Sequence, residues 1–158
     1  MPVLMIDDSG APYTIEFNCR FGDPETQPIM CRLQSDLVEL IEAALDSRLD
    51  TVTAEWRDQA AVGVVLAAAG YPQDPRKGDV ISGITEANQT GKVFHAGTAF
   101  NSRHELVTHG GRVLCVVGLG ADIKTAQTKA YTALESIKFA GMQYRHDIGA
   151  KALKAVDN

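Results

Sequence analysis

The chain has 158 residues, of which 45% are hydrophobic and 22% are charged, and these proportions are ordinary for a globular domain. The length predicts one domain, or one domain with a small appendage, and it allows a core to be buried. The net charge is −5. This charge argues against non-specific binding of nucleic acid, because such binding needs clustered Lys and Arg side chains.

Neither a membrane span nor a secretory signal is predicted. The longest apolar run, residues 60–70, falls short of the roughly 18 apolar residues that a spanning helix needs. The N-terminus has no basic start before its few apolar residues, so it does not have the pattern of a signal peptide. Three cysteines are too few for a disulfide framework. They indicate a reducing compartment, the cytoplasm.

The first 18 residues predict two short strands joined by an Asp-Asp-Ser-Gly turn at residues 7–10. In the second strand, apolar and polar residues alternate from Tyr13 to Asn18. Because side chains alternate between the two faces of a strand, this pattern puts Glu16 and Asn18 on the same face, opposite the aromatic and aliphatic side chains.

A polar loop over residues 19–27 precedes a helical pattern, and Pro28 suits the first turn of that helix. Asp36 and Glu39 have the spacing of a capping box within the pattern, so one kinked helix and two separate helices are both open. Residues 49–58 lose the periodicity, and we expect a boundary there.

The second half of the chain predicts mainly strands. We expect strands at residues 60–69 and 92–98, and a hairpin formed by residues 105–108 and 112–118 with its turn at 109–111. Asp122 is expected to cap a helix with an apolar stripe that extends to Ile137. A short strand at 142–144 and a frayed C-terminal helix follow. These elements together predict an α+β chain.

The densest group of polar residues with side chains suited to catalysis or ligand binding lies between residues 16 and 27. A carboxylate and an amide oxygen on one strand face, here Glu16 and Asn18, suit a hard cation such as Mg²⁺. A nearby arginine, Arg20, can bind a phosphate through its planar fork. A metal beside an arginine is what phosphoryl transfer needs, since both offset the charge on the moving group.

Spacing alone does not establish that chemistry. Most Glu/Asn alternations mark only the solvent face of a half-buried strand. Asp23, Glu25 and Thr26 can equally belong to a turn and a helix cap. Other candidate residues have plainer interpretations: His95 is expected to be structural, Cys115 to lie in the core, and Gly118-x-Gly120 to form a turn rather than part of a dinucleotide fingerprint.

The wider sequence strings are more specific. They closely resemble the end of the ATP-grasp module and the C-terminal domain of the phosphoribosylamine–glycine ligase family, also called glycinamide ribonucleotide synthetases. The resemblance runs in order along nearly the whole chain. It rests on IEFNCRFGDPETQ at 15–27, QSDL at 34–37, GYP at 70–72, GKVFHAGT at 91–98, GGRVL at 110–114 and RHDIG at 145–149.

This resemblance implies a fold and an activity. Residues 1–48 would be the tail of an ATP-grasp module, residues 49–58 a linker, and residues 59–158 a small β-rich domain similar to the hybrid-motif barrel of biotin carboxylase relatives. The activity implied is an ATP-dependent ligase of purine biosynthesis. It joins glycine to 5-phosphoribosylamine and releases ADP and phosphate, with Mg²⁺ or Mn²⁺ as the metal.

The resemblance also assigns roles to individual residues. Glu16 and Asn18 match the metal ligands that bridge the ATP phosphates, and Arg20 is placed at the transferring phosphate as the catalytic residue. The positions that match substrate-binding parts of the family are Asp23, Glu25, Thr26, Arg145 and Asp147. For Arg145 and Asp147, a plain surface ion pair is an equally good interpretation.

The chain also departs from the family. It resembles only the last third, without the N-terminal substrate domain, the glycine-rich lid or the ATP-binding lysines, so we expect it to be inactive alone. Gln34 stands where lysine is common, and Lys151 where arginine is expected. The alternatives are a non-catalytic binding or interaction module, one half of a split ATP-grasp ligase, and an ATP-grasp ligase for another carboxylate. The RFGDPETQ string argues against the last of these.

Overall fold

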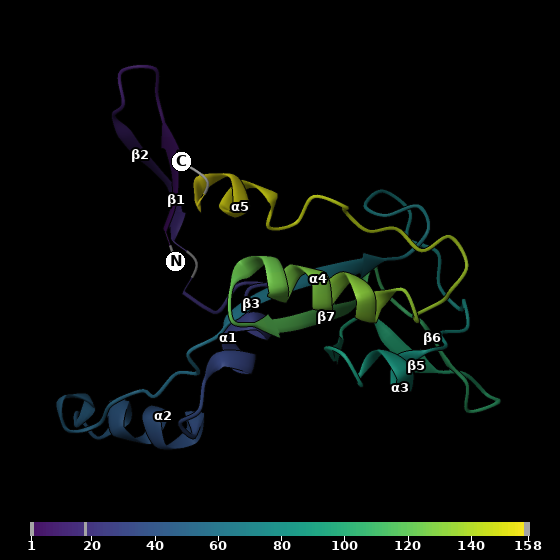
Figure 1. The fold of residues 1–158 in the computed structure, drawn as a ribbon, viewed down its shortest axis with the longest axis horizontal. Helices are drawn as coiled ribbons and strands as arrows, with labels where there is room; N and C mark the ends of the chain where they lie inside the picture. Colours follow the sequence, from purple (N-terminus) through teal and green to yellow (C-terminus); the bar gives the residue numbers. More distant parts are fainter. Residues whose placement is uncertain (1, 18, 157–158) are drawn as a thin grey trace.

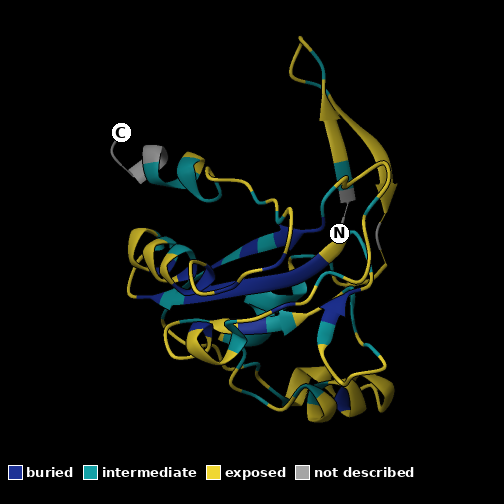
Figure 2. Ribbon diagram, turned by 90° about the vertical axis from the view of Figure 1, so that its right-hand side faces the viewer, coloured by how far each residue is buried: buried dark blue, intermediate teal, exposed yellow. Residues whose placement is uncertain are grey.

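The N-terminal hairpin is confirmed in a computed structural model that describes residues 2–17 and 19–156. Strand β1 (Pro2–Ile6) pairs antiparallel with β2 (Pro12–Phe17). The Asp7 carboxylate closes the turn, because its Oδ1 accepts hydrogen bonds from the backbone N–H groups of Ser9 and Ala11. The hairpin projects from the rest of the molecule (Figure 1), and most of its residues are exposed (Figure 2).

The pairing of the hairpin is irregular beside Glu16. Val3 pairs with Glu16, whereas Leu4 pairs with Thr14, so Ile15 is passed over in the register. An extra residue of this kind bends the strand and changes the direction of nearby side chains. The simple alternation expected from residue 13 onward is therefore interrupted at Ile15. Asn18, the other predicted metal ligand, lies outside the described residues.

The helical segment consists of two helices rather than one kinked helix. Helix α1 (Thr26–Arg32) ends before α2 (Leu37–Leu45) begins, and the Asp36 carboxylate caps α2 by accepting a hydrogen bond from the Val38 N–H group at 2.8 Å. Pro28 lies in the first turn of α1, as predicted. Helix α2 stands away from the central sheet (Figure 1), and its Val38, Ile41 and Leu45 side chains are exposed.

Residues 49–58 contain only one short helical element, the 3-10 turn η1 (Leu49–Thr51). The segment nevertheless follows the end of α1 closely. The Gln34 N–H donates to the carbonyl of Glu55 at 2.9 Å, and the Arg57 N–H donates to the carbonyl of Arg32 at 2.8 Å. These bonds attach the expected linker to the segment between α1 and α2.

The centre of the molecule is an antiparallel sheet in the order β3-β7-β4, formed by β3 (Ala60–Ala67), β7 (Arg112–Gly120) and β4 (Lys92–His95). Helix α4 (Ile123–Leu134) covers one face, and the short helix α3 (Ile84–Ala87) lies beside it. Asp122 caps α4 as predicted, since its carboxylate accepts from the Thr125 N–H. The alanines that α4 presents to the sheet let it approach closely, and the main core lies between them (Figure 2).

The opposite face of the sheet carries α1. Val64 of β3 faces α4 in the core, whereas its neighbour Gly63 faces α1: a Cβ at Gly63 would come within 2.9 Å of Pro28 Cγ and 3.3 Å of Cys115 Sγ. Adjacent strand residues point to opposite faces, so the two helices enclose β3 and β7 between them. Cys115 is buried under α1, as the sequence predicts for a core cysteine.

The predicted hairpin at 105–118 is wrong. Strand β6 (Leu106–Thr108) pairs with β5 (Thr98–Phe100) in a separate two-stranded sheet, while β7 belongs to the central sheet. The glycines between β6 and β7 bring the chain beside Gly97 instead of closing a tight turn: the His109 N–H donates to the Gly97 carbonyl, and the Gly97 N–H donates to the Arg112 carbonyl, both at 2.8 Å.

Two other expected strands are also modified. The segment 92–98 divides into β4 and the first residue of β5. Residues 142–144 do not form a strand; Gln143 makes only an isolated bridge to Ala67 at the end of β3. The C-terminal helix is present as α5 (Ala150–Val156). The α+β class is confirmed, and within the described residues no helix is long and apolar enough to cross a membrane.

The close contact between α4 and β7 gives a stability prediction. A Cβ at Gly118 would overlap backbone atoms of Ala126 and Ala130, whereas a Cβ at Gly63 meets side-chain atoms. We expect Gly118→Ala to lower the free energy of unfolding by about 3 kcal/mol and Gly63→Ala by about 1 kcal/mol, as typical for overpacked sites. Urea unfolding measures both, and equal losses would contradict the packing described for α4.

Burial of Cys115 gives a second prediction. Burial raises the pKa of this thiol to about 12, with smaller contributions from the charges of Asp23 and Cys31. Only the thiolate reacts with alkylating reagents, so at pH 8 iodoacetamide should modify the exposed Cys19 first and leave Cys115 intact until the chain is unfolded in urea. Modification of Cys115 at the rate of Cys19 in the folded chain would contradict its position beneath α1.

Candidate functional site

The loop before α1 is a compact turn, and together with the first residue of α1 it contains four of the eight predicted site residues. The Gly22 carbonyl accepts hydrogen bonds from both the N–H and the hydroxyl of Thr26. The Glu25 carboxylate lies over Gly22, where a Cβ would overlap it. Arg20 turns back along the loop, and its Nη1 donates to the Phe21 carbonyl at 3.1 Å.

Arg112, the first residue of β7, connects this loop to the central sheet. Its Nη1 donates to the backbone carbonyl of Asp23 at 2.8 Å, and its Nη2 lies 3.1 Å from the Asp23 carboxylate. Both side chains are about half exposed, so the ion pair itself adds little stability. The contact between Arg112 and Asp23 matters for geometry instead, because a guanidinium that contacts two groups of one residue restricts the orientation of that residue.

A groove of about 390 Å³ borders this contact. Its floor includes Val65 and Ala67 of β3, on the same face of the sheet as α1. The Tyr71 ring lies against Gly111, where any side chain would overlap it. The complete lining is Val65, Ala67, Tyr71, Arg112, Gln143, Tyr144 and Arg145.

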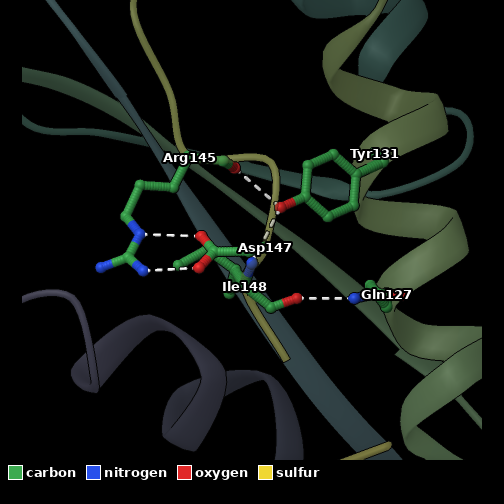
Figure 3. A network of polar contacts seen from close by, with 5 residues as sticks. All are labelled: Gln127, Tyr131, Arg145, Asp147 and Ile148. Carbon is green, nitrogen blue, oxygen red and sulfur yellow. Dashed lines mark hydrogen bonds and ion pairs between the residues drawn. The ribbon is translucent and has the colours of Figure 1, made fainter. Parts of the chain in front are cut away.

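Arg145 and Asp147 form a two-point ion pair at this groove (Figure 3). Arg145 Nε lies 2.9 Å from Asp147 Oδ1, and Nη2 lies 2.7 Å from Oδ2. The hydrogen bond from Arg145 lowers the pKa of Asp147, and Asp147 in turn raises the pKa of Arg145. The residues form the exposed ion pair that the sequence allowed, and Arg145 also lines the groove; their role in substrate binding stays a prediction.

The structure therefore brings some predicted residues together and leaves others apart. Arg112 and Arg145 both line the groove, and Arg112 also binds Asp23. Thr26 bonds to Gly22 within the loop that carries Asp23, and the Glu25 carboxylate lies over Gly22. Glu16 lies in the projecting β2, away from the groove lining. Among the described residues, no three His, Cys, Asp or Glu side chains gather in a way that could hold a metal ion.

A second, larger cavity of about 490 Å³ lies beside α1. It is lined by Pro28, Ile29, Arg32, Trp56 and Ala61. None of these residues was predicted to act in chemistry, and the lining offers one arginine and no acid, base or nucleophile. We therefore place the candidate site at the Arg112 groove despite its smaller volume.

The sequence interpretation assigned no role to several residues that shape the groove. Arg112 and Tyr71 belong to strings that carried the family resemblance, yet only their place in the fold shows what they contact. Gln127 and Tyr131 on α4 bond to the loop that contains Arg145 (Figure 3). The one sequence signal for this pair is its spacing of four residues, which puts both side chains on one helix face.

The contact between Arg112 and Asp23 gives a prediction for this site. In Arg112→Ala the Asp23 loop loses its attachment to β7, so amide hydrogen exchange over residues 22–26 should become faster by about tenfold, as expected for loss of a hydrogen bond to a charged group. Exchange in β3 should not change. Arg103→Ala, in the exposed turn between β5 and β6, is the matched control, and equal exchange in both variants would contradict the role of Arg112.

Three comparisons with known proteins agree with this structure. The family described as "Phosphoribosylglycinamide synthetase, C domain" matches residues 61–151. A phosphoribosylamine–glycine ligase of Neisseria meningitidis serogroup B is 69% identical over 150 residues, which cover 95% of this chain and 36% of that protein. The Pseudomonas aeruginosa enzyme of the same name is 58% identical over 151 residues, which cover 95% of this chain and 35% of that protein.

The fold comparison gives the same family. The crystal structure of phosphoribosylamine–glycine ligase from Thermotoga maritima superimposes with a TM-score of 0.71 at 40% identity, over 92% of this chain and 35% of that one. The chain thus spans about a third of the length of the relatives that it matches, and the match is to their C-terminal part. The chain belongs to the phosphoribosylglycinamide synthetase C-domain family.

Proposed function

We propose that this chain supplies the C-terminal part of a phosphoribosylamine–glycine ligase. In the complete reaction, a carboxylate oxygen of glycine attacks the γ-phosphorus of ATP, which releases ADP and forms glycyl phosphate. The amine of 5-phosphoribosylamine then attacks the glycyl carbonyl carbon, a proton leaves the nitrogen, and inorganic phosphate departs. The product is glycinamide ribonucleotide. The chain spans only about a third of its relatives, so the activity needs the remaining two thirds.

One observation carries this proposal most directly. Strings that are far apart in the sequence meet at one groove: Tyr71 from GYP, Arg112 from GGRVL and Arg145 from RHDIG line it, and Arg112 holds Asp23 from RFGDPETQ. A set of loops on one side of a rigid sheet is how substrates are usually positioned. We propose that Asp23, Glu25, Thr26, Arg145 and Asp147 form the substrate side of the active site.

We propose that residues at the β2 end of the loop bind the phosphates of ATP, directly or through a metal ion. Glu16 and Asn18 are proposed as ligands of Mg²⁺ or Mn²⁺. Glu16 belongs to an exposed strand, and a single carboxylate with substrate phosphates and water is a usual Mg²⁺ environment in proteins. The metal, when bound, offsets negative charge on the phosphates. Arg20 is proposed to bind the transferring phosphoryl group through guanidinium N–H donors other than the one that bonds to the Phe21 carbonyl.

The exposed apolar surface supports the division into domains. Hairpin side chains including Ile6, Tyr13, Ile15 and Phe17 are between 57% and 71% exposed, and apolar surface of this kind marks an interaction site. We propose that residues 1–48 complete the ATP-grasp module, that 49–58 join it to the barrel-like domain 59–158, and that the remaining two thirds of the enzyme cover the hairpin.

The three free cysteines fit a reducing cytoplasm.

The proposal can be tested in a chimera in which this chain replaces the matching C-terminal part of the N. meningitidis relative. With ATP, glycine and 5-phosphoribosylamine, the chimera should produce glycinamide ribonucleotide and phosphate, whereas this chain alone should release no phosphate above background. An inactive chimera that folds normally, or turnover by the chain alone, would contradict the proposal. The first result would favour a non-catalytic binding module.

The same chimera tests the metal assignment. Glu16→Gln retains the shape of the side chain but removes its negative charge, so the metal should be bound more weakly. We expect turnover to fall by at least about tenfold, equivalent to about 1.4 kcal/mol in the barrier, with partial recovery at raised Mg²⁺. Asp8→Asn removes an exposed carboxylate from the turn of the same hairpin and serves as the control. Unchanged turnover and Mg²⁺ dependence in Glu16→Gln would refute the assignment.

A further inference from the structure

We propose that Tyr131 and Gln127 of α4 are positioning residues that set the place of Arg145 at the groove. This inference rests on the proposed function, because it assigns the groove to a substrate of the ligase reaction. Neither side chain lines the groove. Both act through the backbone of residues 145–148, which lies between them and the Arg145 guanidinium (Figure 3).

The Tyr131 hydroxyl uses both of its hydrogen-bonding functions on this segment. It donates to the Arg145 carbonyl at 2.7 Å and accepts from the Ile148 N–H at 3.1 Å. One oxygen atom thereby joins two backbone groups that are three residues apart. Residues 145–148 have no regular secondary structure of their own, so these bonds replace those that a helix or strand would supply.

Gln127 provides a second attachment from the same face of α4. Its Nε2 donates to the Ile148 carbonyl at 2.7 Å, so both backbone polar groups of Ile148 are bonded to α4. The Tyr131 and Tyr144 rings also lie near each other, with centroids 6.4 Å apart. Since α4 itself packs on the central sheet, the segment is connected to the helix that covers the main core.

These attachments determine where the charged side chains can lie. Arg145 and Asp147 point away from α4 in Figure 3 and pair with each other. A guanidinium has five N–H donors, and Asp147 engages Nε and Nη2, so Nη1 is left to bind an oxygen of a ligand. A displacement of the loop by about 1 Å would misplace this donor, and such errors can lower rates by about a hundredfold.

The charges around the groove indicate the class of substrate. Arg112 is paired with Asp23, and Arg145 is paired with Asp147, so each guanidinium charge is already offset by a carboxylate. A triphosphate carries several negative charges and needs unpaired cations to offset them, so a groove with this balance, lined also by Val65, Tyr71 and Tyr144, suits a sugar carrying one phosphate better than a triphosphate. We therefore assign the groove to the phosphoribosyl substrate and not to ATP.

Tyr131→Phe is the informative substitution, because it removes only the hydroxyl. In this chain, amide exchange at Ile148 should become about tenfold faster, as expected for loss of one hydrogen bond. In the active chimera, kcat/KM for 5-phosphoribosylamine should fall about tenfold, while the KM for ATP stays unchanged. Gln127→Ala should produce the same pattern with a smaller effect. Thr128→Val, which removes a hydroxyl bonded only within α4, should behave like the parent.

The two measurements separate this inference from the proposed function. If the parent chimera makes no product, the proposed function fails, and the inference about the reaction fails with it; Ile148 exchange then decides only whether Tyr131 holds the loop. If the chimera is active, unchanged exchange in Tyr131→Phe would overturn the inference. Faster exchange at Ile148 with the kinetics of the parent chimera would overturn it as well. Equal losses in kcat/KM for ATP and for 5-phosphoribosylamine would also overturn it, because the attachment would then be structural only.

Discussion

The arrangement of the candidate site depends on the contact between Arg112 and Asp23. One guanidinium binds both the carbonyl and the carboxylate of Asp23, and it thereby connects the loop before α1 to the start of β7. The contact is half exposed and contributes little energy. Without it, however, the Asp23 loop would lose this attachment to the first residue of β7, which also lines the groove.

The sheet gives that contact a rigid base. Gly63 and Gly118 lie on opposite faces of the paired strands β3 and β7, and each lets one helix approach closely, α1 on the first face and α4 on the second. The two loops of the candidate site are then attached to the two helices: the RFGDPETQ loop leads into α1, and the RHDIG loop is bonded to α4. Thus one of these segments is attached to each of the two helices, and Arg145 of the second lines the groove beside Arg112, which binds Asp23 of the first.

Local patterns predicted those parts of the fold that depend on local physics. The hairpin turn at Asp7, the cap at Asp36 and the cap at Asp122 all follow from short-range hydrogen bonds that the residue types indicate. The error at residues 105–118 has a non-local cause, because the partners of β6 and β7 are set by β5 and β3. A turn signal at Gly110 shows that the chain changes direction, and it does not show to which sheet each strand belongs.

The candidate site was predictable to a similar extent. The RFGDPETQ and RHDIG strings identified Asp23, Arg145 and Asp147 as residues of interest, and the structure shows that Asp23 is bound by Arg112, which lines the same groove as Arg145. Arg112 could not be given a role from sequence, since its partner is 89 positions away. The metal ligands remain a prediction, because Asn18 lies outside the described residues and Glu16 lies on an exposed strand.

The central claim is that the Arg112 groove, and not the larger cavity beside Trp56, receives the phosphoribosyl substrate. It can be tested by NMR on the chimera, with this segment labelled and glycinamide ribonucleotide added as the ligand. Saturable shifts should appear at the Nε resonances of Arg112 and Arg145, with the Trp56 indole resonance unchanged. Saturable shifts at Trp56, with both arginines unaffected, would contradict the claim.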